Sequence, residues 1–249
     1  MARPATTSPE EWAVRCDLAA LYRLTALYGW DDLIFTHISA RVPGPAHHFL
    51  INPYGMMFEE ITASSLVKVD AAGEKVEPSD YDINPAGFTI HSAVHAARDD
   101  ARFVMHLHTV AGVAVSAQQG GLLPLSQHSL FPLASLSYHD YEGVALNPDE
   151  KVRLVADLGA TSLMILRSHG LLTLGHSAAD TFLKMFMLQR ACEIQLAAQA
   201  GGGALIQIPA PILAGIRAQS DRVMRGSGAE LAWPGLLRRL ARQNPGHDD

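Results

Sequence analysis

The chain has 249 residues, of which 48% are hydrophobic and 18% charged, and its formal net charge is −6. This length is sufficient for one large buried core and lies within the usual size of a single domain. The negative charge, without clusters of Lys and Arg, argues against a nucleic-acid partner. No signal peptide or apolar run of membrane-spanning length is evident, and the two cysteines lie far apart. We therefore expect a cytoplasmic protein with no membrane partner, formed by one domain over 1–249 with its core at about 10–205 and a helical extension at 206–249.

The N-terminal part of the chain predicts one helix followed by extended segments. Ser8 is a typical N-cap, with Pro9 at the first helical position and Glu11 three residues after the cap. Apolar or alternating segments then predict strands at 33–42, 47–55 and 65–77. A helix is expected after Pro85, and the apolar run 101–108 predicts a return to strand.

The rest of the chain continues to alternate between helix and strand signals. A short helix is predicted at 110–118, a polar loop around His128, and a strand at 132–139. Asn147 and Pro148 predict the start of another helix. The segment 162–175 predicts two strands around a Ser-His-Gly turn, and a long helix follows from Ser177 to about Ala200. The polar C-terminal end is expected to be mobile, because weakly hydrophobic termini rarely stay ordered.

Two histidines bracket one leucine at the end of an apolar run, in "FVMHLHT". In an extended strand, residues two apart point to the same face, so His106 and His108 are expected to project together. An isolated pair of this kind also fits two structural histidines. His169 favours a functional interpretation, because it ends another apolar strand in a turn where Gly170 supplies backbone freedom. Three imidazoles suit zinc and related divalent metals and leave a coordination position open for substrate.

The remaining histidines carry weaker signals. His37 alternates onto a polar strand face together with Ser39, which suggests the wall of a pocket. His91 and His95 lie four residues apart on one helical face, where they could pair, line a pocket or only pack.

The chain resembles the class II aldolase/adducin superfamily, and most closely the adducin head domain and its bacterial relatives. The resemblance covers roughly residues 10–205 and rests on "THISARV", "TASSLVKVD", "NPAGFTIHSAVHAARDDARFVMHLHT", "YHDYEG" and "SHGL". It implies a three-layer α/β/α fold around a mixed, mostly antiparallel sheet. It also implies that His106, His108 and His169 bind a divalent metal, with zinc expected first and iron(II) or manganese as alternatives.

One departure from the family concerns the catalytic carboxylate. Sugar-phosphate aldolases of this family carry a Ser-Ser-Glu motif that binds phosphate and moves the proton, with its Glu nineteen residues before the first histidine of the pair. That position is Gly87 in this chain, and the two serines are replaced by Pro85 and Ala86. The family's phosphate-binding loop appears as "NPYG", 52–55. A non-phosphorylated substrate is therefore expected, and glycine at 87 is expected to leave room for one bulkier than a triose.

Candidate residues for the substrate and for proton transfer follow from the same comparison. His128 is the first candidate for acid/base chemistry, since it falls near the place where the family's tyrosine acts from a neighbouring subunit. Tyr138, with His139 and Tyr141, is a weaker candidate. The predicted substrate-binding residues are His37, Tyr54, Gly55, Asn84 and Gly87.

Three functional hypotheses remain open from the sequence. The first is a metal-dependent lyase that cleaves a carbon–carbon bond of a non-phosphorylated carbonyl compound or hydroxy acid, by retro-aldol reaction or decarboxylation. The second is an iron(II)-dependent oxygenase on the same fold. The third is a non-catalytic adducin-like interaction module. Because active sites of the family lie between subunits, a homotetramer that acts on a small molecule is expected.

Overall fold

The computed structural model describes residues 4, 6–143, 149–216, 218–220 and 228–249. Among them, seven strands form one sheet in the order β3-β2-β1-β4-β7-β6-β5. In chain order these are β1 (His37–Arg41), β2 (Phe49–Ile51), β3 (Val67–Val69), β4 (Phe103–Leu107), β5 (Leu136–His139), β6 (Leu163–Leu166) and β7 (Gly170–Gly175). Within this sheet β5 and β6 are parallel, and the other neighbouring strands pair antiparallel. The predicted mixed, mostly antiparallel sheet is confirmed.

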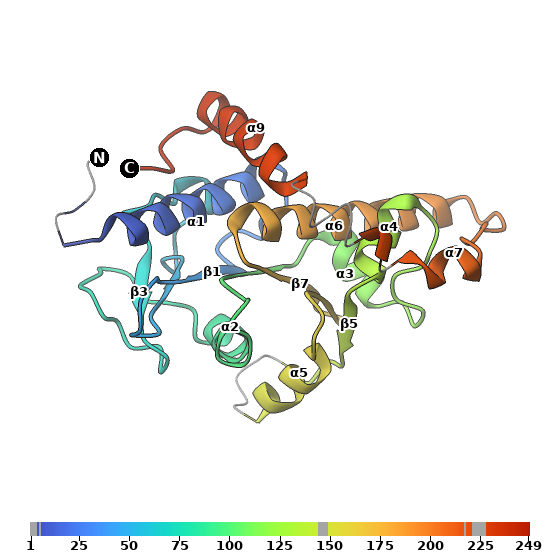
Figure 1. The fold of residues 1–249 in the computed structure, drawn as a ribbon, viewed down its shortest axis with the longest axis horizontal. Helices are drawn as coiled ribbons and strands as arrows, with labels where there is room; N and C mark the ends of the chain where they lie inside the picture. Colours follow the sequence, from blue (N-terminus) through green and yellow to red (C-terminus); the bar gives the residue numbers. More distant parts are fainter. Residues whose placement is uncertain (1–3, 5, 144–148, 217, 221–227) are drawn as a thin grey trace.

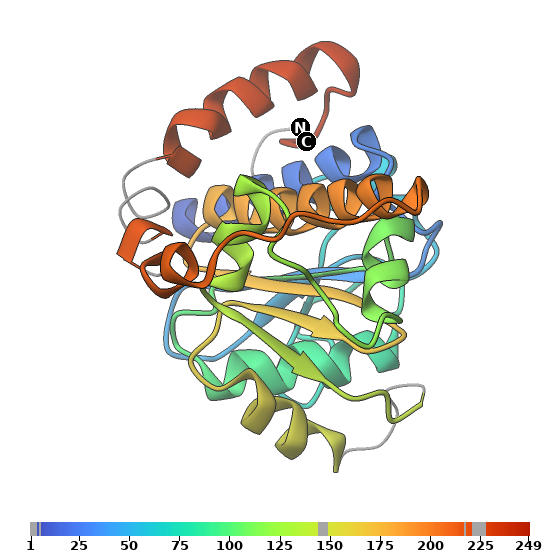
Figure 2. The same cartoon turned by 90° about the vertical axis from the view of Figure 1, so that its right-hand side faces the viewer.

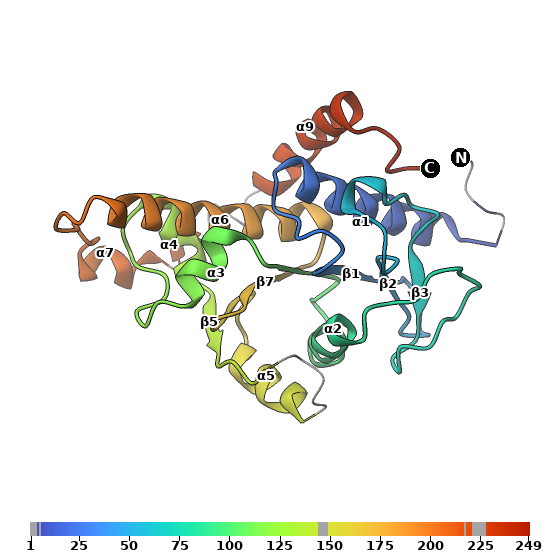
Figure 3. The ribbon, with the colours of Figure 1, turned by 180° about the vertical axis from the view of Figure 1, so that it is seen from behind.

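Helices cover both faces of the sheet and give three layers (Figures 1 and 2). One face carries α1 (Pro9–Leu27), α3 (Val110–Ser116), α4 (Gln127–Leu133) and α6 (Ala178–Ala200), and the other carries α2 (Pro85–Ala97) and α5 (Glu150–Leu158). The short helix η1 (Phe58–Glu60) packs on α1, α7 is Ala210–Ala214, and α9 (Gly228–Gln243) lies outside α1 and α6. From behind, the sheet is seen to continue past β1 to β2 and β3 (Figure 3). The predicted α/β/α architecture is confirmed.

Strand alternation divides the core and decides on which side the functional residues lie. On β4, Met105 and Leu107 point into the larger cluster under α1 and α6, whereas Val104 belongs to the cluster under α2 and α5. Residues two apart share a face, so His106 lies on the side of Val104. The neighbouring strand β1 pairs His37 with His106 in register. Polar residues therefore gather on the α2 side of the sheet.

Local signals explain where several elements begin. Ser8 caps α1, because its hydroxyl oxygen accepts a hydrogen bond from the backbone N–H of Glu11 at 3.1 Å, as predicted. The strand predicted at 33–42 begins only at His37, since Leu33 and Thr36 have φ of 53° and 68°. A left-handed backbone cannot continue a β ladder. Asn147 and Pro148 lie outside the described residues, and α5 begins at Glu150.

The polar loop predicted around His128 is wrong, because these residues form helix α4. Ser126 and Ser129 exchange hydrogen bonds in a capping box at its N-terminus, and this local signal was not recognised in the sequence.

The predicted mobile C-terminal end is also wrong. The backbone N–H groups of Ala63 and Ser64 donate to the carbonyls of His247 and Asp249 at 3.0 and 2.9 Å. Buried Arg23 donates to the carbonyl of Pro245 at 2.7 Å. These hydrogen bonds dock the end of the chain on Arg23 and on the segment that carries Ala63 and Ser64.

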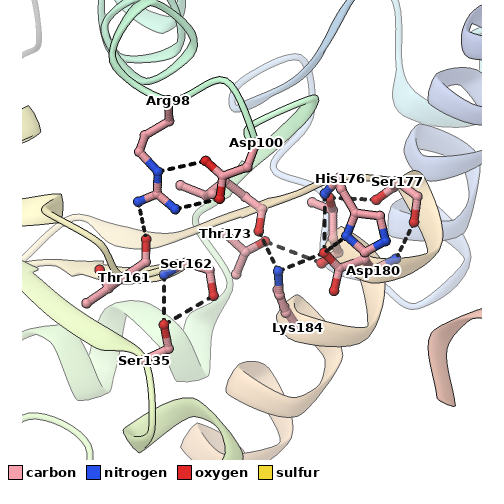
Figure 4. A network of polar contacts seen from close by, with 12 residues as sticks. Arg98, Asp100, Ser135, Thr161, Ser162, Thr173, His176, Ser177, Asp180 and Lys184 are labelled. Atoms are coloured by element: carbon pink, nitrogen blue, oxygen red, sulfur yellow. Dashed lines mark hydrogen bonds and ion pairs between the residues drawn. The ribbon is translucent and has the colours of Figure 1, made fainter. Parts of the chain in front are cut away.

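A polar network ties α2 and α6 to the sheet, at the end of the sheet away from His106 (Figure 4). Arg98 pairs with Asp100 at 2.7 Å and donates to the carbonyl of Thr161 at 2.9 Å, which ties α2 to the start of β6. Lys184 donates to Asp180 at 2.7 Å and to the carbonyl of Leu174 at 3.0 Å, which ties α6 to β7. These hydrogen bonds fix the positions of α2 and α6 relative to the sheet.

Replacing Arg15 by alanine is expected to destabilise the fold by about 3 kcal/mol, because the buried carboxylate of Glu11 then loses one of its two positively charged partners. Arg15 and Lys68 lie 2.9 and 2.8 Å from the Glu11 carboxylate. Burial raises the pKa of Glu11, but hydrogen bonds from Lys68 and Arg15 outweigh it, so the net pKa lies below its ordinary value. The stabilisation is therefore present above that ordinary value and is lost as pH falls through the lowered pKa.

Urea unfolding at several pH values measures this effect. The Arg15→Ala protein should also show a weaker loss of stability on acidification. The exposed pair of Arg190 and Glu193 provides the control, since Arg190→Ala should cost no more than about 1 kcal/mol. Equal costs for the two variants would contradict the prediction.

Candidate metal centre

The structure brings His106, His108 and His169 together. His106 lies on β4, and His108 comes just after the end of this strand. His169 lies in the turn between β6 and β7, and β7 pairs with β4 in the antiparallel sense. One ring nitrogen of each lies within 4.8 Å of those of the others, and this group could hold a metal ion. Sheet topology therefore places a residue distant in sequence beside the His-x-His pair.

Hydrogen bonds orient two of these rings. The Nδ1–H of His106 donates to the carbonyl of Leu171 at 3.0 Å, and the Nδ1–H of His108 donates to the carboxylate of Asp32 at 3.1 Å. A neutral imidazole with its proton on Nδ1 has a bare Nε2. The two Nε2 atoms lie 3.0 Å apart. Two bare nitrogens this close repel each other unless a cation lies between them, and metal–nitrogen bonds of about 2.0–2.1 Å produce separations of this size.

The protonation states also suit metal binding. Burial, followed by the neighbouring His169 and His108, lowers the pKa of His106 well below its ordinary value. Burial and then His108 lower the pKa of His169 to about 4. His106 and His169 are therefore neutral near pH 7, the form that ligates metals.

The turn that carries His169 is built differently from the prediction. The left-handed residue is Ser168, with φ of 55°, and not Gly170. Gly170 is required for close approach, because a Cβ there would lie 2.5 Å from the carbonyl oxygen of Leu107 and 3.2 Å from the His108 ring. The glycine lets β7 pass directly beside the end of β4.

A cavity of about 550 Å³ opens beside the three histidines. Four of the predicted substrate-binding residues, His37, Tyr54, Asn84 and Gly87, line it, and Gly55 is not among the lining residues. The lining also includes Asp32, Phe35, Thr36, Pro85, Ile90, Tyr141 and Gly143. Sequence reasoning missed Asp32, since nothing local distinguishes a carboxylate that acts on a histidine 76 residues away.

The two residues predicted to be catalytic, His128 and Tyr138, do not line the cavity. His128 is exposed on α4 and does not line the cavity. Its predicted role is at the cavity of a neighbouring subunit. Tyr138 is also outside the lining, and its hydroxyl oxygen accepts a hydrogen bond from the N–H of Leu122 at 3.0 Å. Of the weaker candidates, Tyr141 reaches the cavity, with its ring centroid 6.3 Å from that of His169, and His139 binds Asp157 instead.

His37 occupies the space beside Gly87. A Cβ placed on Gly87 would lie 2.2 Å from Nδ1 and Cε1 of the His37 ring. We expected glycine at position 87 to leave space there for a bulkier substrate. This expectation is wrong, because the His37 ring fills the space next to Gly87. Sequence reasoning placed His37 in a pocket wall, but did not show that its imidazole takes up the volume of the missing side chain.

A mixed sheet between helical layers, with three convergent histidines beside a cavity, defines a class II aldolase type of protein. The chain belongs to the family described as Class II Aldolase and Adducin N-terminal domain, whose model matches residues 16–196. No helix among the described residues is both long and apolar enough to cross a membrane.

Relatives and solved structures agree with this assignment. A Pseudomonas aeruginosa protein named "Putative aldolase class 2 protein" is 66% identical over 98% of this chain and 95% of its own length. Mouse alpha-adducin is 43% identical over 90% of this chain, which spans 31% of that protein. A crystal structure of an aldolase II superfamily protein from Pseudomonas syringae matches with a TM-score of 0.94 and 51% identity, over 98% of both chains. An L-fuculose 1-phosphate aldolase from Glaciozyma antarctica matches with a TM-score of 0.81 and 26% identity, over 98% of this chain and 96% of that one.

Proposed function

We propose that this protein is a metal-dependent lyase that cleaves a carbon–carbon bond of a non-phosphorylated carbonyl or hydroxy-acid substrate, by retro-aldol reaction or decarboxylation. The observation that carries the proposal is the convergence of His106, His108 and His169, with the Nε2 atoms of His106 and His108 3.0 Å apart, at a cavity of about 550 Å³. Membership of the class II aldolase family and the aldolase names of its relatives support it.

In this proposal His106, His108 and His169 hold a divalent cation, with zinc ahead of iron(II) and manganese because three imidazoles and an open position suit it. When bound, the cation supplies Lewis-acid polarisation of a substrate oxygen. Asp32 and the carbonyl of Leu171 keep two of the rings in the tautomer that ligates. Tyr54, Asn84 and His37 surround the substrate.

Proton transfer needs a group other than residue 87. The candidate within the chain is Tyr141, which is exposed and lines the cavity. His37 also lines the cavity, but both its ring nitrogens are covered and burial lowers its pKa to about 3. His128 retains its proposed role only when a second copy brings α4 to the cavity mouth, which is consistent with the proposed homotetramer. Tyr138 lies outside the lining of the cavity, so its hydroxyl would have to move in order to reach the substrate.

The lining of the cavity supports a substrate without phosphate. Among the described residues that line it there is no Lys or Arg, and Asp32 adds a carboxylate. Phosphate is normally held by cationic side chains or by a cluster of backbone N–H groups.

The zinc-loaded protein is expected to turn over L-fuculose 1-phosphate at least about 10²-fold more slowly than an L-fuculose 1-phosphate aldolase, because both the acid/base carboxylate and the phosphate-binding hydroxyls are absent. A coupled assay of the released aldehyde, run on both enzymes at equal metal occupancy, measures the ratio. Comparable rates would contradict the non-phosphorylated substrate class.

Two alternatives have specific support. Three histidines with open positions also fit iron(II), so an oxygenase remains an alternative. The identity with alpha-adducin supports a non-catalytic module. Protein loaded with zinc, manganese or iron(II) should be screened against 2-hydroxy acids, 2-oxo acids and aldol products, with oxygen consumption followed in parallel. Cleavage without oxygen uptake supports the lyase, uptake with iron(II) alone supports the oxygenase, and inactivity with every metal would overturn both.

A further inference from the structure

We propose that helix α5 positions Tyr141 beside the metal centre, because side-chain pairs before and after this residue attach it to one face of that helix. His139 precedes Tyr141 and Glu142 follows it, and both bind side chains of α5. The attachment to α5 rests on these contacts alone, whereas the contact of Tyr141 with a substrate rests in addition on the proposed function.

Strand pairing brings Tyr141 to the three histidines. Strands β5 and β6 run parallel with His139 opposite Leu166, and the N–H of Arg167 donates to the carbonyl of His139 at 2.8 Å. The segments that follow two parallel strands leave the sheet at the same edge. Tyr141 therefore emerges beside His169, and the centroids of their rings lie 6.3 Å apart.

The sheet does not hold Tyr141 itself. Strand β5 ends at His139, and Tyr141 is 56% exposed, so little buried area fixes its ring. Segments beyond the end of a strand open readily when they have few buried contacts. The contacts of the neighbouring residues therefore decide how often this ring lies over the cavity.

The first contact is made by His139, whose imidazole is buried. Its Nδ1–H donates to the carboxylate of Asp157 at 2.7 Å, and a carboxylate oxygen of Glu150 lies 3.6 Å from its Nε2. A hydrogen bond to an ionised carboxylate is stronger than one between neutral groups. The backbone is thus fixed to α5 two residues before Tyr141.

The second contact is made by Glu142. Nε of Arg153 donates to one carboxylate oxygen of Glu142 at 2.6 Å, and an Nη of the same guanidinium donates to the other. Two parallel bonds fix the relative orientation of the two groups. The hydrogen bond from Arg153 lowers the pKa of Glu142, so the carboxylate is ionised at neutral pH. The backbone is thus fixed to α5 again, one residue after Tyr141.

The partners on α5 share one face of the helix. Glu150, Arg153 and Asp157 follow one another at intervals of three and four residues, and residues so spaced are neighbours on a helix surface. The helix is itself anchored, because Leu154 and Leu158 belong to the buried cluster under the sheet. Arg153 and Asp157 are therefore positioning residues that act on the site through Tyr141.

Fluorine spectra of the cobalt-loaded full chain, labelled with 3-fluorotyrosine, test this arrangement, because the paramagnetic shift falls steeply with distance from the metal. Tyr141→Phe identifies the signal, which should carry a large shift in the wild type. Arg153→Gln or Asp157→Ala should each lower that shift by about twofold, since a surface ion pair changes a local equilibrium by a factor of up to about five. Tyr81, which is exposed and outside the cavity lining, is the internal reference.

Charge reversal separates positioning from a general loss of structure. Glu142→Arg and Arg153→Glu should each reduce the shift, and the variant that carries both should restore it. Arg190→Gln, which removes the exposed pair with Glu193 on α6, should leave it unchanged. A wild-type shift in every variant, with cobalt bound, overturns the positioning by α5 and leaves the proposed function standing. Failure of the wild type to bind cobalt overturns the metal centre, and with it both the proposed function and this inference.

Discussion

Alanine at His106, His108 or His169 is expected to abolish stoichiometric metal binding in each of three separate variants. Each removes one of three imidazole donors whose nitrogens lie within 4.8 Å of one another, and we expect that two remaining protein ligands do not retain a divalent cation through dialysis. Metal content per chain after dialysis against a weak chelator, measured by plasma mass spectrometry, gives the result. We expect affinities lower than wild type by more than about 100-fold, the upper end of what a partner behind the ligands contributes.

Two further variants make this experiment selective. Asp32→Asn weakens the support of His108 without removing a ligand, so affinity should fall by about 10–100-fold while binding remains measurable. His176→Ala removes an exposed histidine outside the site and should retain full metal content. Circular dichroism spectra should match for all variants. One metal per chain in all three alanine variants would show that the triad is not the binding site.

A side chain at position 87 is expected to destabilise the protein by about 1–3 kcal/mol through its collision with His37. From the spacing alone, Gly87→Glu is expected to add a fourth metal ligand and to reduce native activity by blocking the open coordination position. In the structure a Cβ at this position would lie 2.2 Å from the His37 ring, so even Gly87→Ala must displace that imidazole. Urea unfolding of the metal-free protein measures the cost without interference from ligation.

A double-mutant cycle tests whether this loss of stability comes from the contact between residue 87 and His37. If the collision with His37 is the cause, Gly87→Ala in a His37→Ala background should cost almost nothing, which leaves an interaction energy of about 1–3 kcal/mol. In the same background Gly87→Glu has room to approach the centre, and a cobalt-loaded sample should then show an absorption spectrum of higher coordination number. Strict additivity of the two substitutions would mean that residue 87 does not face His37.

The histidines of the site follow from local patterns in the sequence. Alternation in a strand was enough to place His106 and His108 on one face, and the breaks around "SHG" placed His169 at a strand end. These are local properties, because side-chain direction has a period of two along any strand. Ser8 as the cap of α1 was likewise readable, since a cap bonds to a backbone only three residues away.

Tertiary structure alone decided what completes the site. Asp32 reaches His108 from a distant loop, the His37 ring fills the volume beside Gly87, and Ser39 joins β1 to two histidines of α2. The late start of β1 and the docking of the C-terminal end on Arg23 were likewise decided only by the tertiary structure. Each depends on which buried donor meets which acceptor, or which ring meets which backbone, after the layers have packed. A periodic pattern reports the face on which a side chain lies, whereas its partner is set by contacts between segments far apart in the chain.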